Sequence, residues 1–152
     1  MKNIKLKIIG YVESPVKDQT DEHWGEAEAR VVLQPEYREG LRGIEQFSHA
    51  LIVTFLHEAH FEPSRHLIRR PRGLASMPEA GIFAQRAKDR PNPIGITAVS
   101  ITGVESGALV VRGLDAIDGT PVLDVKPYYP AYDRVNKATV PEWVDRLMKD
   151  YF

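Results

Sequence analysis

Short apolar runs rich in β-branched residues recur along the chain, and prolines or glycines interrupt the segments between them. Residues 26–33 alternate apolar with polar side chains, which predicts a half-buried strand. Residues 47–56 are almost continuously apolar, which predicts a central strand covered on both faces. Residues 94–104 and 108–114 flank a three-residue segment that ends in glycine, as hairpin loops often do. The pattern favours a mostly β fold.

Weaker signals extend the pattern toward the N-terminus. Alternation over residues 4–8 predicts a first strand, which Ser14-Pro15 ends because proline cannot donate to a strand ladder. Residues 35–44 have apolar residues at helical spacing but also two glycines, so they predict only a short helical turn. Residues 122–125 add another short β-rich run.

The C-terminal region predicts one amphipathic helix that packs on the rest. Thr139 and Glu142 have the spacing of a capping box. A stripe at helical spacing follows, made of Val144, Leu147, Met148 and Tyr151. Many short strands with few helices and no repeating strand–helix alternation predict an all-β barrel or sandwich with helical additions.

Composition narrows the class of protein. A length of 152 residues predicts a single domain over residues 1–152. Twenty Lys and Arg against 21 Asp and Glu give a formal net charge of -1, so the overall charge shows no basic footprint for nucleic acid. The lack of cysteine excludes disulfides, thiolate catalysis and cysteine-bound metals, and it permits a reducing cytoplasm. No apolar run approaches the roughly 18 residues of a membrane span, so we expect neither a membrane segment nor export.

The sequence gives little support for a common nucleotide-binding loop or a metal site. The chain has neither the GxxxxGK[ST] loop of nucleotide-binding proteins nor a GxGxxG sequence after a strand. His57 and His60, with His66 nearby, have ligand types that suit zinc, but they follow a predicted strand instead of lying on a helix. We interpret them as loop histidines and expect no metal; contact between His57 and a cofactor is a separate possibility.

Two segments are harder to explain as scaffold alone. In residues 81–95, Arg86, Lys88 and Arg90 precede two prolines around Asn92. The prolines pre-order the loop and so lower the entropic cost of presenting these groups to a polar ligand. The alternative is a solvated loop whose arginines pair with surface acids.

The second segment is residues 114–128. Asp115, Asp118, Asp124 and Lys126 surround a turn in an otherwise β-rich context. Burial of that many charges requires pairing or a ligand. The alternative is a hairpin turn with Asp124 and Lys126 on its wet face.

Residues 81–95 (GIFAQRAKDRPNPIG) and 114–128 (LDAIDGTPVLDVKPY) resemble the two signature motifs of the TsaA-like family. Residues 9–15, 43–49 and 70–73 agree with that resemblance, which spans about residues 8 to 130. The best-known members are tRNA adenosine N6-methyltransferases that use S-adenosylmethionine. The resemblance implies an antiparallel β-barrel of about six to seven strands with short helical additions and a C-terminal helix. It also implies a homodimer with the methyl donor beside the barrel.

The resemblance also implies a set of cofactor-binding residues. The family's pocket maps onto the predicted loop before the second strand, the end of the central strand, the first motif and the turn of the second motif. In this chain these positions are Trp24, Gly25, His57, Glu58, Arg86, Ile96, Ile117, Asp118 and Gly119.

Methyl transfer is an in-line displacement that depends on alignment and on exclusion of water, so we expect no covalent intermediate. An exocyclic adenine amine must lose a proton as it is methylated, and a nearby carboxylate helps by accepting it. We predict Asp115 or Asp118 as that acceptor and Lys126 as the residue that orients the loop through an ion pair.

The resemblance therefore implies a cytoplasmic methyltransferase acting on N6 of an adenosine, threonylcarbamoyl-modified, beside the tRNA anticodon. The family's tRNA enzymes usually carry a further C-terminal domain, and we expect this chain to have only the barrel and one closing helix. Basic residues over 65–90 offer contacts to tRNA phosphates, although a solvated or cofactor-facing loop explains them nearly as well. The alternatives are a module that binds S-adenosylmethionine or RNA without turnover, and a methyltransferase for another small substrate.

Overall fold

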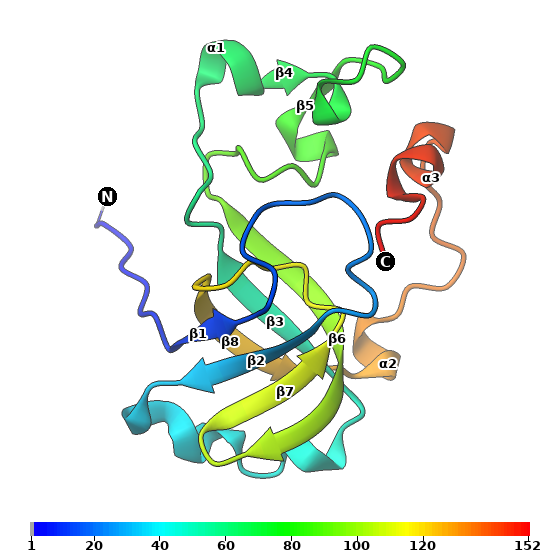
Figure 1. The fold of residues 1–152 in the computed structure, drawn as a ribbon. Helices are drawn as coiled ribbons and strands as arrows, with labels where there is room; N and C mark the ends of the chain where they lie inside the picture. The colour runs from blue at the N-terminus through cyan, green and yellow to red at the C-terminus, as the bar shows by residue number, and fades with distance from the viewer. Residues whose placement is uncertain (1) are drawn as a thin grey trace.

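Six strands close into an antiparallel barrel in the computed structural model, which describes residues 2–152 (Figure 1). Around the barrel the order is β1-β2-β7-β6-β3-β8, and β8 pairs again with β1. The strands are β1 (Gly10–Glu13), β2 (Glu28–Leu33), β3 (His49–Phe55), β6 (Ile94–Glu105), β7 (Ala108–Arg112) and β8 (Pro121–Pro127). The prediction of a mostly β barrel is confirmed.

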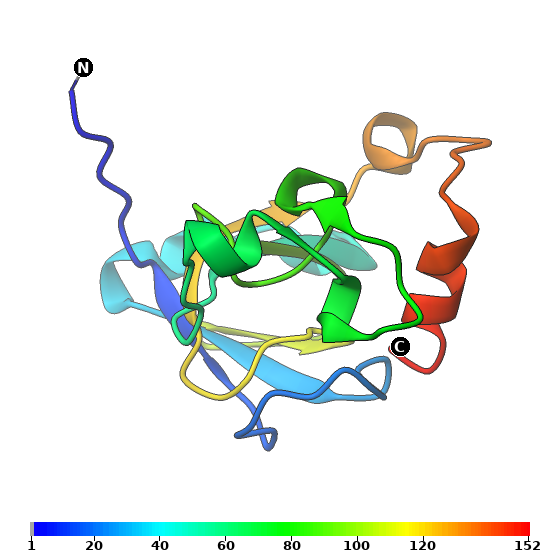
Figure 2. The same ribbon diagram turned by 90° about the horizontal axis from the view of Figure 1, so that it is seen from above.

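The segment between β3 and β6, residues 56–93, forms a separate lobe above one end of the barrel, as Figures 1 and 2 show. It holds α1 (Pro63–His66), a two-stranded sheet of β4 (Ile68–Arg69) and β5 (Ala80–Gly81), and the short turns η3 (Pro71–Gly73) and η4 (Ile82–Ala84). The other helical elements are η1 (Pro35–Leu41), η2 (Ile44–Gln46), α2 (Pro130–Asp133) and α3 (Glu142–Met148). None of the helices within residues 2–152 has the length and hydropathy to cross a bilayer.

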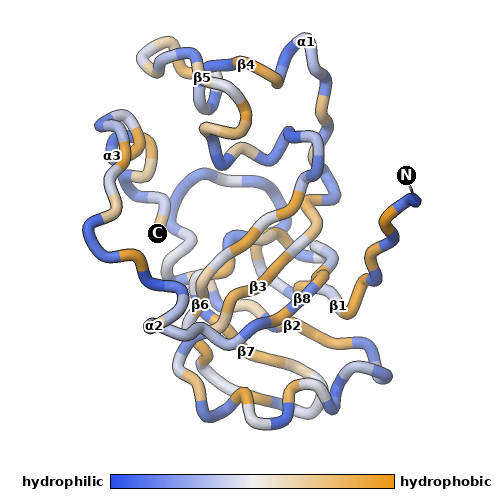
Figure 3. Tube along the Cα trace, turned by 180° about the vertical axis from the view of Figure 1, so that it is seen from behind, coloured by the Kyte–Doolittle hydropathy of each residue, from blue (hydrophilic) through white to orange (hydrophobic). Residues whose placement is uncertain are grey.

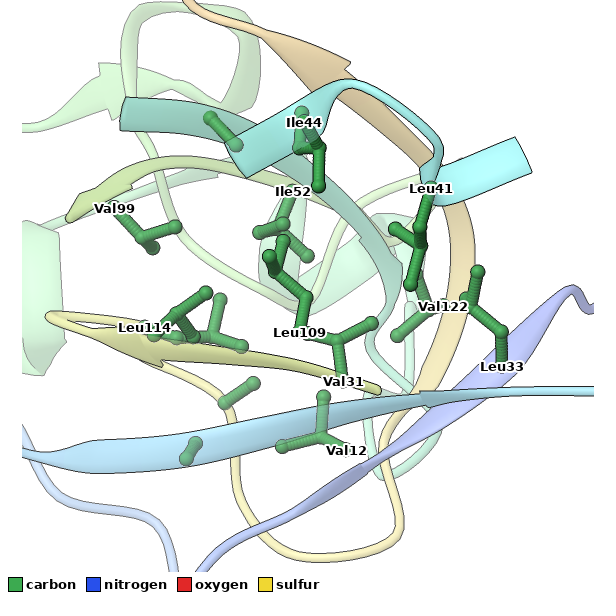
Figure 4. Close-up of a cluster of buried hydrophobic side chains, with 14 residues drawn as sticks. Val12, Val31, Leu33, Leu41, Ile44, Ile52, Val99, Leu109, Leu114 and Val122 are labelled. Atoms are coloured by element: carbon green, nitrogen blue, oxygen red, sulfur yellow. The ribbon is translucent and has the colours of Figure 1, made fainter. Parts of the chain in front are cut away.

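The barrel interior is the hydrophobic core. The side chains that fill it alternate along the strands, because successive residues of a strand point to opposite faces. Val31, Ile52, Leu109 and Val111 are fully buried there, with Val122 from β8 (Figure 4). Burial of a side chain of this size contributes about 1.5–3 kcal/mol. The barrel is therefore a rigid base for the loops that leave its ends.

The structure corrects the prediction for β3. Alternate residues of this strand are buried, but Leu51 and Val53 on the other face are only half-buried. A closed barrel gives each strand one inner and one outer face, so β3 is not covered on both sides. Its nearly continuous apolar sequence correctly indicated a strand. The inference that both faces of that strand are covered was wrong.

The first strand was also predicted too early. Residues 4–8 are not in a strand, and Ile4 and Leu6 are exposed on a segment that projects from the barrel (Figure 3). Gly10 lies opposite Leu33, the last residue of β2, so the chain before it has no β2 residue left to pair with. A Cβ at Gly10 would lie 2.3 Å from the Val32 carbonyl oxygen, so glycine permits the close approach of β1 to β2.

The other local predictions are largely confirmed. The strands β6 and β7 form a hairpin in which Gly107 has a φ of 74°, a conformation that favours glycine. The C-terminal helix is α3, and it begins after Pro141 with no side-chain cap, so the capping box predicted from Thr139 is wrong. Tyr151 lies beyond the end of this helix.

Candidate functional site

The two family-like motifs meet at the barrel end beneath the lobe. The β1–β2 loop (residues 14–27) crosses this end between barrel and lobe, and the C-terminal tail (residues 149–152) runs down from α3 to lie beside it (Figures 1 and 2). The β7–β8 loop (residues 113–120) lies at the same end, because antiparallel strands return their connections there. Hydrogen bonds between these loops, described below, define the candidate site.

Asp118 holds the β7–β8 loop against the β1–β2 loop. Its Oδ1 accepts a hydrogen bond from the Ser14 N–H at 2.9 Å, and its Oδ2 lies 2.7 Å from the Lys17 ammonium. The Lys17 hydrogen bond and the Ser14 N–H hold the pKa of Asp118 below its usual range. Gly119 completes the turn with a φ of 82°. Asp118 is therefore ionised, its carboxylate links the two loops, and it is a weak base.

Asp115 occupies the middle of the site. One of its carboxylate oxygens accepts a hydrogen bond from the Thr97 hydroxyl of β6, and the other accepts one from the Tyr151 hydroxyl of the tail. Thr97 follows Ile96, whose carbonyl oxygen accepts a hydrogen bond from Arg86 Nη2 at 3.1 Å. Through Thr97, the structure thus links Asp115 to the stretch of β6 that Arg86 contacts.

Tyr151 in the tail belongs to the site, although the sequence pattern places it only in a helical stripe. The N–H groups of His23 and Trp24 donate to the carbonyl oxygens of Asp150 and Tyr151, both at 2.7 Å. Burial, and then the charge of Asp115, raise the pKa of Tyr151 far above its usual range, so its hydroxyl stays protonated and donates. The Arg72 guanidinium lies 5.9 Å from the centre of the Tyr151 ring. No local pattern indicates this role, because Tyr151 and Asp115 are 36 residues apart.

Trp24 and Gly25 support the tail. Trp24 is almost completely buried, and its indole N–H donates to the Thr20 carbonyl oxygen at 2.9 Å. A Cβ at Gly25 would lie 2.7 Å from the carbonyl carbon of Phe152. Ile117 is also buried, and its carbonyl oxygen accepts the Thr120 hydroxyl hydrogen bond at 2.7 Å. Trp24, Gly25 and Ile117 therefore fix the shapes of the β1–β2 and β7–β8 loops through burial, close approach and hydrogen bonds within those loops.

His57 and Glu58 lie where predicted, just after β3, and both are exposed. Glu58 Oε2 accepts a hydrogen bond of 3.4 Å from Gln19 of the β1–β2 loop, so this loop reaches across to the end of β3. His60 instead lies 3.0 Å from a carboxylate oxygen of Glu62. Within residues 2–152, no three His, Asp or Glu side chains are grouped so that they could hold a metal ion.

The three basic residues of the first motif have different surroundings. Arg90 turns into the lobe, where its Nη1 donates to the carbonyl oxygens of Gln85 and Ala87 at 2.9 and 3.2 Å. Lys88 pairs with Asp89 at 3.1 Å. Arg86 has the single contact to Ile96, which leaves other N–H groups for a ligand. Of the three, Arg86 has the geometry of a binding residue.

Lys126 is not brought together with Asp115 or Asp118. Its ammonium lies 2.8 Å from Asp124 Oδ2, and that hydrogen bond with its charge raises the pKa of Lys126. The two residues are two positions apart on β8, so their side chains share one face of the strand. The alternative is correct that both side chains share a wet face, but its hairpin is wrong, because β7 pairs with β2 and β6 whereas β8 pairs with β1 and β3.

Comparisons with known proteins identify the family. A model of the family described as the tRNA-methyltransferase O N-terminal domain matches residues 13–134. The chain belongs to this family. The matched region contains the lobe and the barrel from the last residue of β1 onward, and it includes Asp115, Arg86 and the β1–β2 loop. Tyr151 lies outside it.

Individual relatives agree with the family assignment. An Archaeoglobus fulgidus protein named S-adenosyl-L-methionine-binding protein is 39% identical over 136 residues, which cover 87% of this chain and 94% of that protein. A human protein named tRNA (adenine(37)-N6)-methyltransferase is 39% identical over 104 residues, 68% of this chain and 23% of that protein.

A crystal structure of TrmO from Pseudomonas aeruginosa matches with a TM-score of 0.73 and 33% identity, over 91% of this chain. The aligned part is 62% of that structure, so the chain spans about three fifths of its length. The barrel assigned from the sequence resemblance is therefore the fold of this family.

Proposed function

We propose that the protein is an S-adenosylmethionine-dependent methyltransferase that acts on N6 of an adenosine in tRNA. The names of the Archaeoglobus and human relatives support the methyl donor and the tRNA substrate, respectively. The observation that carries the proposal is that Asp115 of the second motif accepts a hydrogen bond from Thr97 of β6, directly after Ile96, whose carbonyl oxygen accepts a hydrogen bond from Arg86 of the first motif. Within tRNA we propose the adenosine beside the anticodon in its threonylcarbamoyl form, and a tRNA substrate favours action in the cytoplasm.

The chemistry of the residues fits S-adenosylmethionine, which supplies an activated methyl group on its sulfonium. Arg86 has guanidinium N–H groups available for the carboxylate of the methyl donor. The exposed carboxylate of Glu58 and the neighbouring His57 suit its hydroxyl and amine groups. Ile96, about half of whose surface is exposed, offers an apolar wall for an adenine. These side chains come from β6, the lobe and the end of β3.

Asp115 is our proposed proton acceptor. Methylation of an exocyclic amine releases one proton as the new N–C bond forms, and a carboxylate oxygen of Asp115 takes that proton. Asp118 suits this task less well, because its carboxylate pairs with the charged Lys17 ammonium, whereas Asp115 accepts hydrogen bonds from the neutral hydroxyls of Thr97 and Tyr151. Asp118, Gly119 and Ile117 instead set the shape of the loop that carries Asp115.

We also propose that the 152 residues act as one domain in a homodimer. Leu67, Ile68 and Phe83 expose much of their apolar surface on the lobe, next to the motif that carries Arg86. Burial of such side chains against a second copy is favourable. Light scattering on the full chain tests the dimer: a mass of one subunit for both wild type and Phe83→Glu would contradict it.

Methyl transfer tests the proposed function. The purified full chain is incubated with methyl-labelled S-adenosylmethionine and bulk tRNA, and digested nucleosides are examined for N6-methylated adenosine. The proposal predicts label in that nucleoside. Binding of S-adenosylmethionine in calorimetry without transfer to any tRNA would contradict it and favour the second candidate, a binding module, to which the name of the Archaeoglobus relative points.

A further inference from the structure

An aromatic groove lies at the opposite ends of β3 and β8 from the candidate site. It forms because β3 begins at His49 where β8 ends, and the Tyr128 N–H donates to the His49 carbonyl oxygen at 3.0 Å. The hollow measures about 590 Å³ and is lined by Gln46, Phe47, Ser48, Tyr128, Tyr129 and residues 130–132. Six residue steps of about 3.3 Å along β3 place it about 20 Å from the candidate site.

The aromatic rings of this groove are pre-arranged and open to solvent. The rings of Phe47 and Tyr129 stack with centroids 5.8 Å apart and planes inclined by 22°. Tyr129 is half exposed, and Tyr132 is 85% exposed, which leaves its ring faces free for contact. The Tyr129 N–H donates to the Asp133 carboxylate at 2.8 Å, which holds α2 in place. The order of this segment lowers the entropic cost of binding a planar ligand.

Two exposed cations follow α2 along the chain, and one exposed acid, Glu45, precedes the lining residue Gln46. Arg134 directly follows α2, Lys137 lies three residues further, and both are exposed. Within the described residues 2–152, neither side chain has an ion pair or a hydrogen bond, in contrast to Lys126, which is paired with Asp124. The acid of α2, Asp133, is already used to accept the Tyr129 N–H. Two unpaired cations next to exposed tyrosines complement an anionic ligand with planar groups.

We propose that this groove binds a single-stranded segment of the RNA substrate. A base stacks on Tyr132 and the Phe47–Tyr129 pair, and Arg134 and Lys137 contact phosphates. Gln46 and Ser48 supply polar groups at the edge of the stacked base. The inference rests on the proposed function for its choice of RNA, and it adds a second contact remote from the transferred methyl group. A second copy of the chain is the alternative occupant of the groove, and light scattering distinguishes it from RNA.

Binding of fluorescein-labelled single-stranded RNA, followed by anisotropy without methyl donor, tests the stacking contact. Loss of one base–aromatic stack predicts that Tyr132→Ala weakens binding at least about fivefold, while Tyr132→Phe keeps affinity within about twofold. The exposure of Tyr132 makes a folding defect in these variants unexpected, and thermal melting checks it. Tyr11→Ala, at an exposed aromatic on β1, is the matched control and leaves affinity unchanged.

The dependence of affinity on salt tests the phosphate contacts separately. Removal of two such contacts in Arg134→Gln/Lys137→Gln makes the negative slope of log affinity against log salt shallower by about 1.4, whereas Tyr132→Ala leaves the slope unchanged. Equal RNA affinity of wild type and Tyr132→Ala overturns the proposal, and so does a wild type that binds no RNA. Light scattering identifies a second copy as the occupant if Tyr132→Ala dissociates a dimer without affecting RNA. Methylation of tRNA by a Tyr132→Ala protein at the wild-type rate and affinity would contradict this inference while leaving the proposed function intact.

Discussion

The barrel wall and the loops at its site end are held together by different forces. The wall depends on fully buried apolar side chains such as Val31, Ile52 and Leu109. The site end depends on hydrogen bonds between distant segments, including the Ser14 N–H to Asp118, 104 residues away, and Tyr151 to Asp115. Damage to the wall should therefore unfold the protein, whereas damage to the loops should change the site and leave the barrel intact.

The largest loss of stability is expected from a change in the buried side chains of the barrel wall. Leu109→Ala removes a fully buried side chain from the barrel core and should lower the free energy of unfolding by about 2–5 kcal/mol. Urea denaturation measures the change. Leu6→Ala, at an exposed position on the segment before β1, is the control and should change stability little. Equal losses in the two variants would contradict the assignment of the core.

The second-largest loss of stability is expected where β1 packs closely against β2 to close the barrel. Gly10→Ala places a methyl group against the Val32 carbonyl oxygen, so β1 must shift away from β2 at a cost of about 1–3 kcal/mol. Gly81→Ala is the control, since a Cβ there meets no atom within 4 Å. A Gly10→Ala protein as stable as Gly81→Ala in the same urea titration would show that the strands do not approach this closely.

Tyr151→Phe should affect the site and leave the wall intact. Loss of the hydroxyl removes one of the two hydrogen bonds that orient the Asp115 carboxylate and should lower kcat several-fold, up to about tenfold, with little change in the urea midpoint. Ultraviolet titration adds a structural test: one of the six tyrosines should resist ionisation in the folded wild type, and the variant should lose that resistant fraction. Tyr132→Phe is the matched control, because its ring is exposed. A resistant tyrosine that persists in Tyr151→Phe would place the raised pKa elsewhere.

The smallest effect concerns Asp118. Because its pKa is lowered in the folded protein, its ionised form stabilises the fold above about pH 4, and that stability is lost as pH falls through the lowered pKa. Asp118→Asn should therefore be slightly less stable than wild type at neutral pH and equal to it in strong acid. Lys17→Gln should reproduce part of the loss. A stability difference between wild type and Asp118→Asn that does not change with pH would argue against this linkage.

The contrast between the barrel wall and the loops at the site end also explains what could be predicted from the sequence. Strand alternation and turn glycines act over a few residues, so β2, β6 and β7 could be located from local pattern. The alternation over residues 4–8 misled because a strand also needs a partner, and β2 ends its pairing at Leu33. The pairing of Lys126 with Asp124 follows from their spacing on one strand, so this signal was present in the sequence.

The site was predictable only through motif resemblance. Arg86, Ile96 and Asp115 lie in or beside the two motifs, and the structure brings them together. Tyr151 could not be found in this way, because its contact depends on where the tail pairs with His23 and Trp24. Long-range backbone pairing of a tail with a loop has no short-range pattern.

Methyl transfer by Asp115→Asn tests the account most directly. The substitution keeps the shape of the side chain but removes the proton acceptor, so kcat should fall about 100-fold or more while S-adenosylmethionine binding changes little. Asp124→Asn changes a carboxylate on β8 that pairs with Lys126 outside the site, and it should retain activity within about twofold. An Asp115→Asn enzyme that methylates tRNA at the wild-type rate with unchanged binding would contradict the assignment of Asp115 as the acceptor.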